Sequence, residues 1–196
     1  MSILAPQFYH HTQVVSIARK LLGKVLITRI NGEVTAGRIV ETEAYSFKER
    51  GCHAYNNRKT PRNAVMFEAG GVAYVYLCYG MHNLFNVVTN KAGRAEAVLI
   101  RAAEPIAGQD IMLRRMKAHK LTRITSGPGK LTRALGIERT LNGASLLNSA
   151  VTIETGIPVR SKNIIATTRI GIDYAGTDAM LPWRFYVKDN EWVSKW

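Results

Sequence analysis

The chain has 196 residues, with 27 lysines and arginines against 14 acidic residues, and a net charge of +13. This length supports one core, so we expect a single domain over residues 1–196. With 46% hydrophobic residues the chain is globular rather than disordered. The positive charge favours a polyanionic partner such as nucleic acid, although a ribosomal or merely solubilising surface would show the same excess.

No basic start followed by a long apolar stretch is present, and no run of about 20 apolar residues occurs. We therefore expect no signal peptide, no membrane contact and a cytoplasmic, nucleoid-associated protein. The two cysteines, Cys52 and Cys78, form neither a disulfide framework nor a paired metal-ligand spacing. Both are predicted to be free thiols, and no metal site is expected.

Taken in chain order, the pattern first predicts an amphipathic helix from Thr12 to Leu22, with Thr12 as its N-cap and Gly23 as its stop. Two strand-like runs follow, Lys24 to Ile30 and Glu33 to Tyr45. The Asn31-Gly32 pair between these runs is a strong signal for a tight β-hairpin.

The remaining elements are read from residue content and from glycine and proline positions. They are a long, functional loop from Arg50 to Phe67, strands Val72 to Leu77, Leu84 to Thr89 and Ala95 to Ala102, a basic helix Ala107 to Lys120, a short helix Gly129 to Leu135, and a C-terminal third of short strands ending in Trp183 to Val193. Short turns between strands favour antiparallel pairing. We expect an α+β fold with a curved antiparallel sheet and peripheral helices.

Two carboxylates occupy one face of a predicted strand end. Side chains alternate along a strand, so Glu41, Glu43 and Tyr45 share a face. An isolated pair of this kind is usually an ordinary solvent-side pair. In a basic protein, however, neighbouring cations keep a carboxylate ionised, which makes these residues candidates for chemistry.

Tyrosines concentrate in the same part of the chain. Five of the eight lie between residues 45 and 79, namely Tyr45, Tyr55, Tyr74, Tyr76 and Tyr79. Such a cluster is often core, but a buried hydroxyl needs a partner, and flat rings near cations suit a stacked base. Two further segments suit phosphates: the basic loop RKTPRN (58–63), and SGPGKL (126–131) at a helix start. Each also has a bland interpretation, as a solvated charge run and as an ordinary turn.

Several segments in combination resemble the alkyladenine, or 3-methyladenine, DNA glycosylase family. They are GRIVETEAY (37–45), TPRN with Met66-Phe67, YVYLCYGMHNLFNV (74–87), VLIRAAEP (98–105), SGPGKL (126–131), RIGI (169–172) and WRFYV (183–187). The resemblance runs from about residue 6 to the C-terminus. It implies one mixed α/β domain that needs no metal or organic cofactor.

The resemblance also implies roles for particular residues. Glu43 corresponds to the general base, and Arg101 to an arginine that helps to hold the water or Glu43. Tyr45, His53 and Tyr76 correspond to residues that sandwich the flipped base, and Asn86 to the one that rejects a normal guanine. Tyr79 corresponds to the wedge inserted into the duplex. Met81 beside it, together with Arg58, Arg62 and Lys130, completes the expected DNA-binding set. Two departures stand out: the loop before His53 is short, and His82 stands where the family often has an aromatic residue.

A mechanism follows from the same residues. Alkylation at N3 or N7 makes a purine cationic, which suits stacking on tyrosine and makes the base a good leaving group. A positioned water and a carboxylate base then suffice for hydrolysis. No lysine lies in the tyrosine cluster, so we expect no strand cleavage. The expected partner is double-stranded DNA carrying damaged purines, bound by a monomer. Two alternatives remain open: a metal-dependent nuclease with Glu41 and Glu43 as ligands, and a non-catalytic RNA-binding module.

Overall fold

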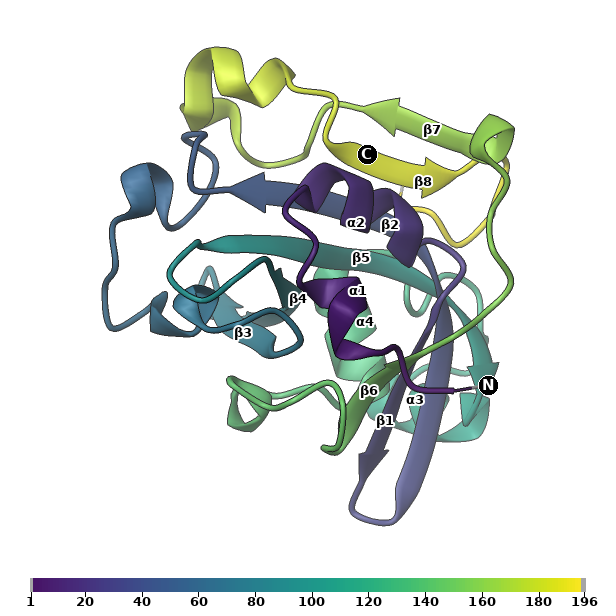
Figure 1. The fold of residues 1–196 in the computed structure, drawn as a ribbon. Coiled ribbons are helices and arrows are strands. Elements are labelled where there is room, and N and C mark those ends of the chain that lie inside the picture. Colours follow the sequence, from purple (N-terminus) through teal and green to yellow (C-terminus); the bar gives the residue numbers. More distant parts are fainter. Residues whose placement is uncertain (1, 195–196) are drawn as a thin grey trace.

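The eight strands form one antiparallel sheet in the computed structural model, which describes residues 2–194 (Figure 1). The strands are β1 (Val25–Ile30), β2 (Glu33–Ser46), β3 (Ala73–Cys78), β4 (His82–Thr89), β5 (Glu96–Ala107), β6 (Val151–Glu154), β7 (Ile164–Thr167) and β8 (Arg184–Val187). Their order is β3-β4-β5-β2-β1-β6, with β7 joined through β8 to β2. The predicted α+β class with an antiparallel sheet is confirmed.

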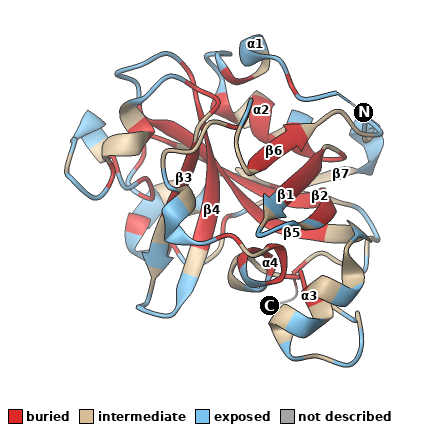
Figure 2. Ribbon diagram, turned by 90° about the horizontal axis from the view of Figure 1, so that it is seen from below, coloured by how far each residue is buried: buried red, intermediate tan, exposed pale blue. Residues whose placement is uncertain are grey.

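Within residues 2–194, four α-helices accompany the sheet: α1 (Pro6–Tyr9), α2 (Val14–Leu21), α3 (Gln109–Met116) and α4 (Pro128–Leu135). Helix α2 lies in front of the sheet in Figure 1 and packs on β2 and β5, whereas α4 lies behind it and packs on β4 and β5. Figure 2 shows the buried strands between these two helices. No described helix is long and apolar enough to cross a membrane.

The predicted hairpin between β1 and β2 is confirmed. Ile30 pairs with Glu33, and the two residues between them, Asn31 and Gly32, have φ values of 52° and 77°. Both values lie in the left-handed region that a two-residue hairpin turn of this kind requires, and asparagine and glycine adopt it most readily.

Strand β2 pairs with two strands in succession along one edge, first β1 and then β8, and with β5 along the other edge. It pairs with β5 along most of its length, with β1 over residues 33–38, and with β8 at residues 41–43. Register shifts against β5 flank Glu41. Such irregularities increase the local twist of a strand and redirect its side chains. The twisted segment of β2 is the one that carries the two predicted carboxylates.

Several predicted boundaries are wrong. Strand β5 continues past Ala102 to Ala107 and takes the start of the predicted basic helix, so α3 begins only at Gln109. That helix ends at Met116, because Lys117 has a φ of 52° and turns the chain. Strand β8 stops at Val187, short of the predicted Val193.

Smaller differences concern helices. Helix α2 begins at Val14 after Gln13, which makes no side-chain cap, so Thr12 is not the N-cap. Helix α1 was not predicted. The long loop 50–67 contains two short 3-10 helices, Tyr55–Asn57 and Ala64–Phe67.

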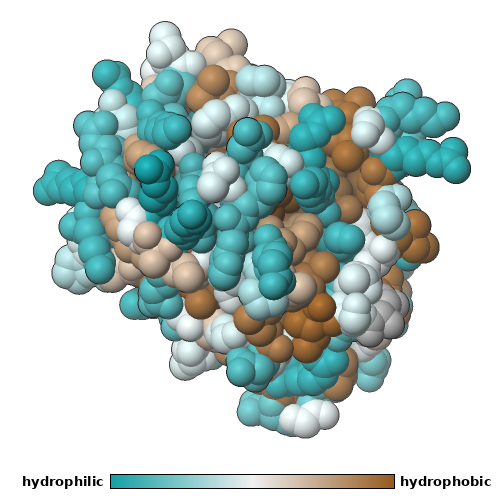
Figure 3. All heavy atoms as spheres, viewed as in Figure 1, coloured by the Kyte–Doolittle hydropathy of each residue, from teal (hydrophilic) through white to brown (hydrophobic). Residues whose placement is uncertain are grey.

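The surface on the side of α1 and α2 is mixed. Figure 3 shows hydrophilic side chains over much of this face, with hydrophobic side chains between them and toward its lower part. Both cysteines are free, Cys52 buried and Cys78 partly exposed, as predicted.

Candidate active site

A cavity of about 810 Å³ collects most of the predicted site residues. Strands β2 to β5, the loop after β2 and the start of α4 contribute to its lining. The predicted residues that line it are Tyr45, His53, Arg62, Tyr76, Tyr79, Asn86, Arg101 and Lys130. A space of this volume is in the range of small-molecule sites, and the chain brings these residues together from positions 45 to 130.

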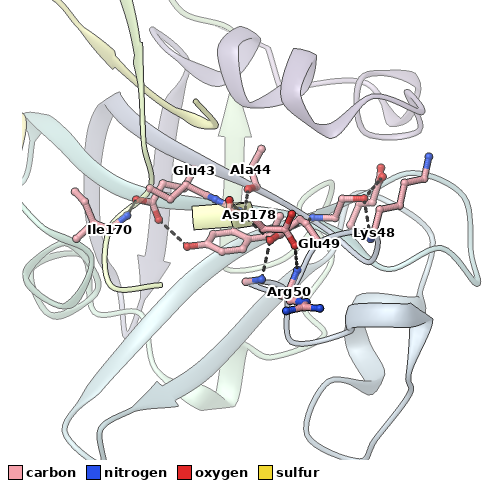
Figure 4. Close-up of polar contacts among 12 residues, drawn as sticks. Glu43, Ala44, Lys48, Glu49, Arg50, Ile170 and Asp178 are labelled. Carbon is pink, nitrogen blue, oxygen red and sulfur yellow. Dashed lines mark hydrogen bonds and ion pairs between the residues drawn. The ribbon is translucent and has the colours of Figure 1, made fainter. Parts of the chain in front are cut away.

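Glu43 lies beneath this cavity, in contact with three of its lining residues, and is fully buried. The Tyr45 hydroxyl donates to Oε2 of Glu43 at 2.8 Å, and the Ile170 amide donates to Oε1 at 2.9 Å (Figure 4). Nη1 of Arg101 lies 3.3 Å from the same Oε1. The alternative of an ordinary solvent-side carboxylate is therefore wrong.

The environment of Glu43 makes it a stronger base than a free glutamate. Burial raises its pKa, and the Arg101 charge and the hydrogen bonds from Tyr45 and Ile170 only partly offset this effect. A carboxylate with a raised pKa holds an abstracted proton more firmly, which suits a general base near neutral pH.

Glu41 has a different environment, in which cations dominate. Nε of Arg101 is 2.9 Å and Nε of Arg184 is 2.7 Å from Oε1 of Glu41, while the Ser194 amide and hydroxyl both donate to the carboxylate at 2.8 Å. Burial opposes ionisation, but the two guanidiniums and Ser194 hold the pKa of Glu41 below its usual value. Glu41 is thus an anionic anchor for Arg101.

This arrangement does not fit the alternative of a metal-dependent nuclease. In that alternative Glu41 and Glu43 would be ligands, but each carboxylate is held by guanidinium and hydrogen-bond donors. Among residues 2–194, no group of three or more His, Cys, Asp or Glu side chains is arranged to hold a metal ion.

Three aromatic side chains form one wall of the cavity. The Tyr74 and Tyr76 rings stack with centroids 5.4 Å apart, and the His53 ring meets Tyr76 edge-on at 4.6 Å. His53 Nδ1 lies 3.0 Å from the Tyr74 hydroxyl. Desolvation and the Arg62 charge lower the pKa of His53 to about 4, so the imidazole is neutral at physiological pH.

The loop that carries His53 is fixed from within. The Asn63 side chain, which is buried, donates to the carbonyls of His53 at 2.9 Å and Arg58 at 3.0 Å. His53 therefore reaches the aromatic wall although the segment between β2 and this residue is short. Arg58 itself is exposed and does not line the cavity.

Asn86 lies between the aromatic wall and Arg101 on the cavity surface, and only 5% of it is exposed. Its side-chain amide donates to the Tyr74 carbonyl at 3.1 Å across the β3–β4 pair. This bond fixes the orientation of the Asn86 side chain.

Tyr79 and Met81 occupy the tight turn between β3 and β4. They are 84% and 73% exposed, unlike most large apolar side chains of the molecule. Tyr79 has a φ of 49° and the next residue, Gly80, a φ of 69°. Tyr79 borders the cavity, while Met81 borders a neighbouring cavity of about 900 Å³.

The start of α4 lines the cavity next to this turn. Gly129 packs directly on His82, and a Cβ at this glycine would lie 2.8 Å from Cγ of the imidazole, closer than real contacts allow. His82 thus supports the first turn of α4, where Lys130 is exposed at the border of both cavities.

A second buried ion pair, which was not predicted from the sequence, lies near Glu43. The Arg169 guanidinium binds the Glu49 carboxylate through two contacts of 2.7 and 2.8 Å, and its carbon lies 4.8 Å from the Tyr45 ring centroid. The RIGI motif contains Arg169 and was a signal, but the sequence did not indicate its partner. Arg184 of the WRFYV motif and Ser194 were missed in the same way.

A buried carboxylate beneath an aromatic cavity, on a strongly basic chain, is a site suited to chemistry on a nucleic-acid base. The model of the family described as methylpurine-DNA glycosylase (MPG) matches residues 7–191. The chain belongs to this family of DNA glycosylases, which act in the repair of damaged DNA.

Curated relatives span nearly the whole chain and carry the name "Putative 3-methyladenine DNA glycosylase". One from Natranaerobius thermophilus is 46% identical over 190 residues, covering 95% of this chain and 96% of the relative. One from Carboxydothermus hydrogenoformans is 49% identical over 195 residues, covering 98% and 100%. One from Methanocella arvoryzae is 50% identical over 198 residues, covering 100% and 97%.

Proposed function

We propose that this protein flips alkylated or deaminated purines out of duplex DNA and hydrolyses their N-glycosidic bond with a water activated by Glu43. The observation that carries the proposal is the position of Glu43 beneath an aromatic cavity, with its carboxylate oriented by Tyr45, Ile170 and Arg101. The substrates proposed are 3-methyladenine, 7-methylguanine, hypoxanthine and ethenoadenine.

Glu43 has capacity for one more donor. A carboxylate oxygen has two lone pairs. Among residues 2–194, Oε2 of Glu43 accepts a hydrogen bond from Tyr45, while Oε1 contacts Ile170 and Arg101. We assign the remaining lone pair of Oε2 to the attacking water. The same negative charge stabilises the oxocarbenium-like sugar as the base leaves.

Arg101 keeps the carboxylate of Glu43 ionised and oriented. Its guanidinium bridges Glu41 and Glu43, so Glu41 carries the charge that balances Arg101 while Glu43 keeps its proton-accepting role. We therefore treat Glu41 as a positioning residue, which holds Arg101 in place through their 2.9 Å contact.

The aromatic residues are proposed to bind the extruded base. Tyr45 on one side and His53 with Tyr76 on the other supply flat surfaces, and an electron-rich ring attracts a cationic base by roughly 0.5 to 2 kcal/mol. Asn86 excludes the exocyclic amino group of guanine by close approach. Its fixed amide supports this role, because a fixed side chain cannot move aside.

Tyr79 is proposed to enter the duplex in place of the extruded nucleotide, with Met81 beside it. An exposed side chain on a tight turn is suited to insertion. Arg58, Arg62 and Lys130 are proposed to contact phosphates around it, and one copy of the chain is sufficient for all these roles.

We propose hydrolysis without strand cleavage. Lys130 is the lysine that borders the cavity among the described residues, and it is exposed. A lysine that forms a Schiff base is activated by desolvation or by a cationic neighbour close to the reacting carbon. Borohydride added during the reaction should therefore trap no covalent complex with DNA.

The decisive experiment is Glu43→Gln with single-turnover release of 7-methylguanine from a duplex. The variant keeps the side-chain shape but cannot take a proton from water, so release should fall by at least about 10²-fold while binding to the damaged duplex persists. Glu104→Gln, at the half-exposed Arg38 pair, is the matched control and should behave as wild type. If Glu43→Gln released 7-methylguanine at a rate within a few-fold of wild type, the assignment of Glu43 as the general base would be overturned.

A further inference from the structure

The ion pair between Glu49 and Arg169 is buried against Tyr45, which is proposed to bind the flipped base. Glu49 is 2% and Arg169 is 5% exposed, although they are 120 residues apart in sequence. Arg169 also donates to the carbonyls of Ala44 at 3.0 Å and Asp178 at 3.1 Å, and Glu49 accepts the Gly51 amide at 2.7 Å. Figure 4 shows Glu49 and Asp178 within this polar network.

Arg169 lies on the side of the Tyr45 ring that faces away from the cavity. Its guanidinium carbon is 4.8 Å from the ring centroid of Tyr45 and 5.3 Å from that of Trp183. Tyr45 is among the described residues that line the cavity, and Arg169 is not. A base stacked on Tyr45 would therefore have a guanidinium behind the ring that it contacts.

That position matters for a base carrying a positive charge. A guanidinium on one face of an aromatic ring weakens the attraction of the opposite face for a cation. It also repels that cation directly, through a medium of low dielectric constant. Glu49, bound through both its oxygens to Arg169, supplies an opposite charge in direct contact with that guanidinium.

We propose that the Glu49–Arg169 pair is a specificity-determining device, which keeps the back of Tyr45 electrically neutral so that cationic and neutral purines are both accepted. This inference rests on the proposed function, because it concerns the base stacked on Tyr45. Removing one charge of the pair changes the preference between the two kinds of base, and the sign depends on which charge is removed.

The experiment measures single-turnover release of 7-methylguanine, which is cationic while its N1 proton is retained, and of hypoxanthine, which is neutral, at the same pH, not above neutrality, and with spontaneous loss subtracted. Glu49→Gln leaves a cation behind the ring, so the ratio of the 7-methylguanine rate to the hypoxanthine rate should fall at least about fivefold. Arg169→Gln leaves an anion there, and the same ratio should rise. The double variant should return the ratio toward wild type.

Two controls separate this charge effect from misfolding. Glu49→Asp keeps the charge and should keep the wild-type ratio, and Glu104→Gln removes a carboxylate from the distant Arg38 pair and should also keep it. Each single variant is informative alone because its direction is predicted. A purely structural pair would slow the release of both bases alike and leave the ratio within about twofold of wild type.

The inference is overturned if both single variants keep the wild-type ratio, or if both move it in the same direction. This outcome can be told apart from failure of the proposed function. If the proposed function is wrong, the wild-type protein releases neither base. If only the inference is wrong, the wild-type protein releases both bases, and the variant ratios alone contradict the inference.

Discussion

The hydroxyl of Tyr45 donates a 2.8 Å hydrogen bond to Oε2 of Glu43, two residues earlier on the same face of β2. Burial and the nearby Glu43 charge raise the pKa of Tyr45 well above its usual value, so the phenol keeps its proton and remains a donor. The residue proposed to stack the base is therefore also the residue that orients the proposed catalytic carboxylate.

This relationship predicts a pH dependence. If Glu43 is the general base, as proposed, release of 7-methylguanine requires its ionised form, so the rate should fall as the pH drops through the raised pKa of that carboxyl. The bond from Tyr45 favours the ionised form, and Tyr45→Phe removes it, so the acid limb of the pH–rate profile should move to higher pH. His53 does not account for the limb, because its pKa is about 4. Tyr55→Phe, outside the cavity lining, is the control, and an unmoved limb in Tyr45→Phe would contradict the prediction.

Glu41→Gln tests the anchor of Arg101. It leaves the buried guanidinium of Arg101 and that of Arg184 without their shared counter-charge, which should lower the free energy of unfolding by about 3–5 kcal/mol at neutral pH. Because the pKa of Glu41 is lowered in the folded state, this stabilisation is present above the usual carboxyl pKa and lost as pH falls through the lowered value.

Urea denaturation at several pH values measures this difference. Glu154→Gln is the control, because its partner Arg29 is half exposed and the loss should stay within about 1 kcal/mol. Equal losses in the two variants would mean that Glu41 is not an anchor.

Asn86→Ser tests discrimination against normal guanine. Serine is shorter and lacks the amide that donates to Tyr74, so the cavity should accept the exocyclic amino group more readily. Release of undamaged guanine, relative to hypoxanthine, should rise above the wild-type ratio. Asn83→Ser, on the same strand but beside the second cavity, should leave the ratio unchanged. If Asn86→Ser also leaves it unchanged, discrimination occurs before the base reaches the cavity.

Tyr79→Ala should have little effect on stability, because the ring is 84% exposed. For comparison, Tyr9→Ala removes a fully buried ring and should cost roughly 3–5 kcal/mol. In the complex, loss of the Tyr79 ring should slow release of a base from a stable pair more than release from a mismatch, which costs less to open. Melting temperature and the two release rates are the measurements. Equal slowing on both substrates would argue against insertion of Tyr79 into the duplex.

Lys130→Ala tests contact with phosphate at the start of α4. Affinity for duplex should fall steeply with salt, and this variant should reduce the slope of log affinity against log salt by about one unit for every sequence tested. Lys20→Ala, on α2 at the opposite side of the sheet, is the matched control. A full slope in the Lys130 variant would show that SGPGKL is only a structural turn.

Features fixed by neighbouring residues were predictable from the sequence. The Asn31-Gly32 turn needs only two adjacent residues that tolerate positive φ, and the shared face of Glu43 and Tyr45 follows from strand alternation. The end of β5 was not predictable in this way. Pro105 lacks an amide donor, yet the strand continues through it because a register shift against β2 occurs opposite Pro105, between Ala36 and Gly37.

The candidate site was predictable to the extent that its residues carry recognisable local motifs. The partners that hold those residues were not, since Glu49 meets Arg169 and Glu41 meets Ser194 only after the chain has folded. Sequence separation of this size leaves no periodic pattern. Local motifs therefore indicated the groups proposed to touch DNA or water, but they did not indicate the residues that orient those groups.

The contacts of Glu41 also bear on how the protein is made. Residues 41 and 194 meet in one cluster although 153 positions separate them, and β8 joins β2 only through residues 184–186. During synthesis, the ribosome releases the chain from the N-terminus onward. A nascent chain can therefore form the β1–β2 hairpin early, but it cannot neutralise Glu41 fully until residues 184–194 have emerged. The finished site is thus a property of the complete sheet, and a stalled or shortened product would retain Arg101 as a partner of Glu41 but would lack Arg184 and Ser194.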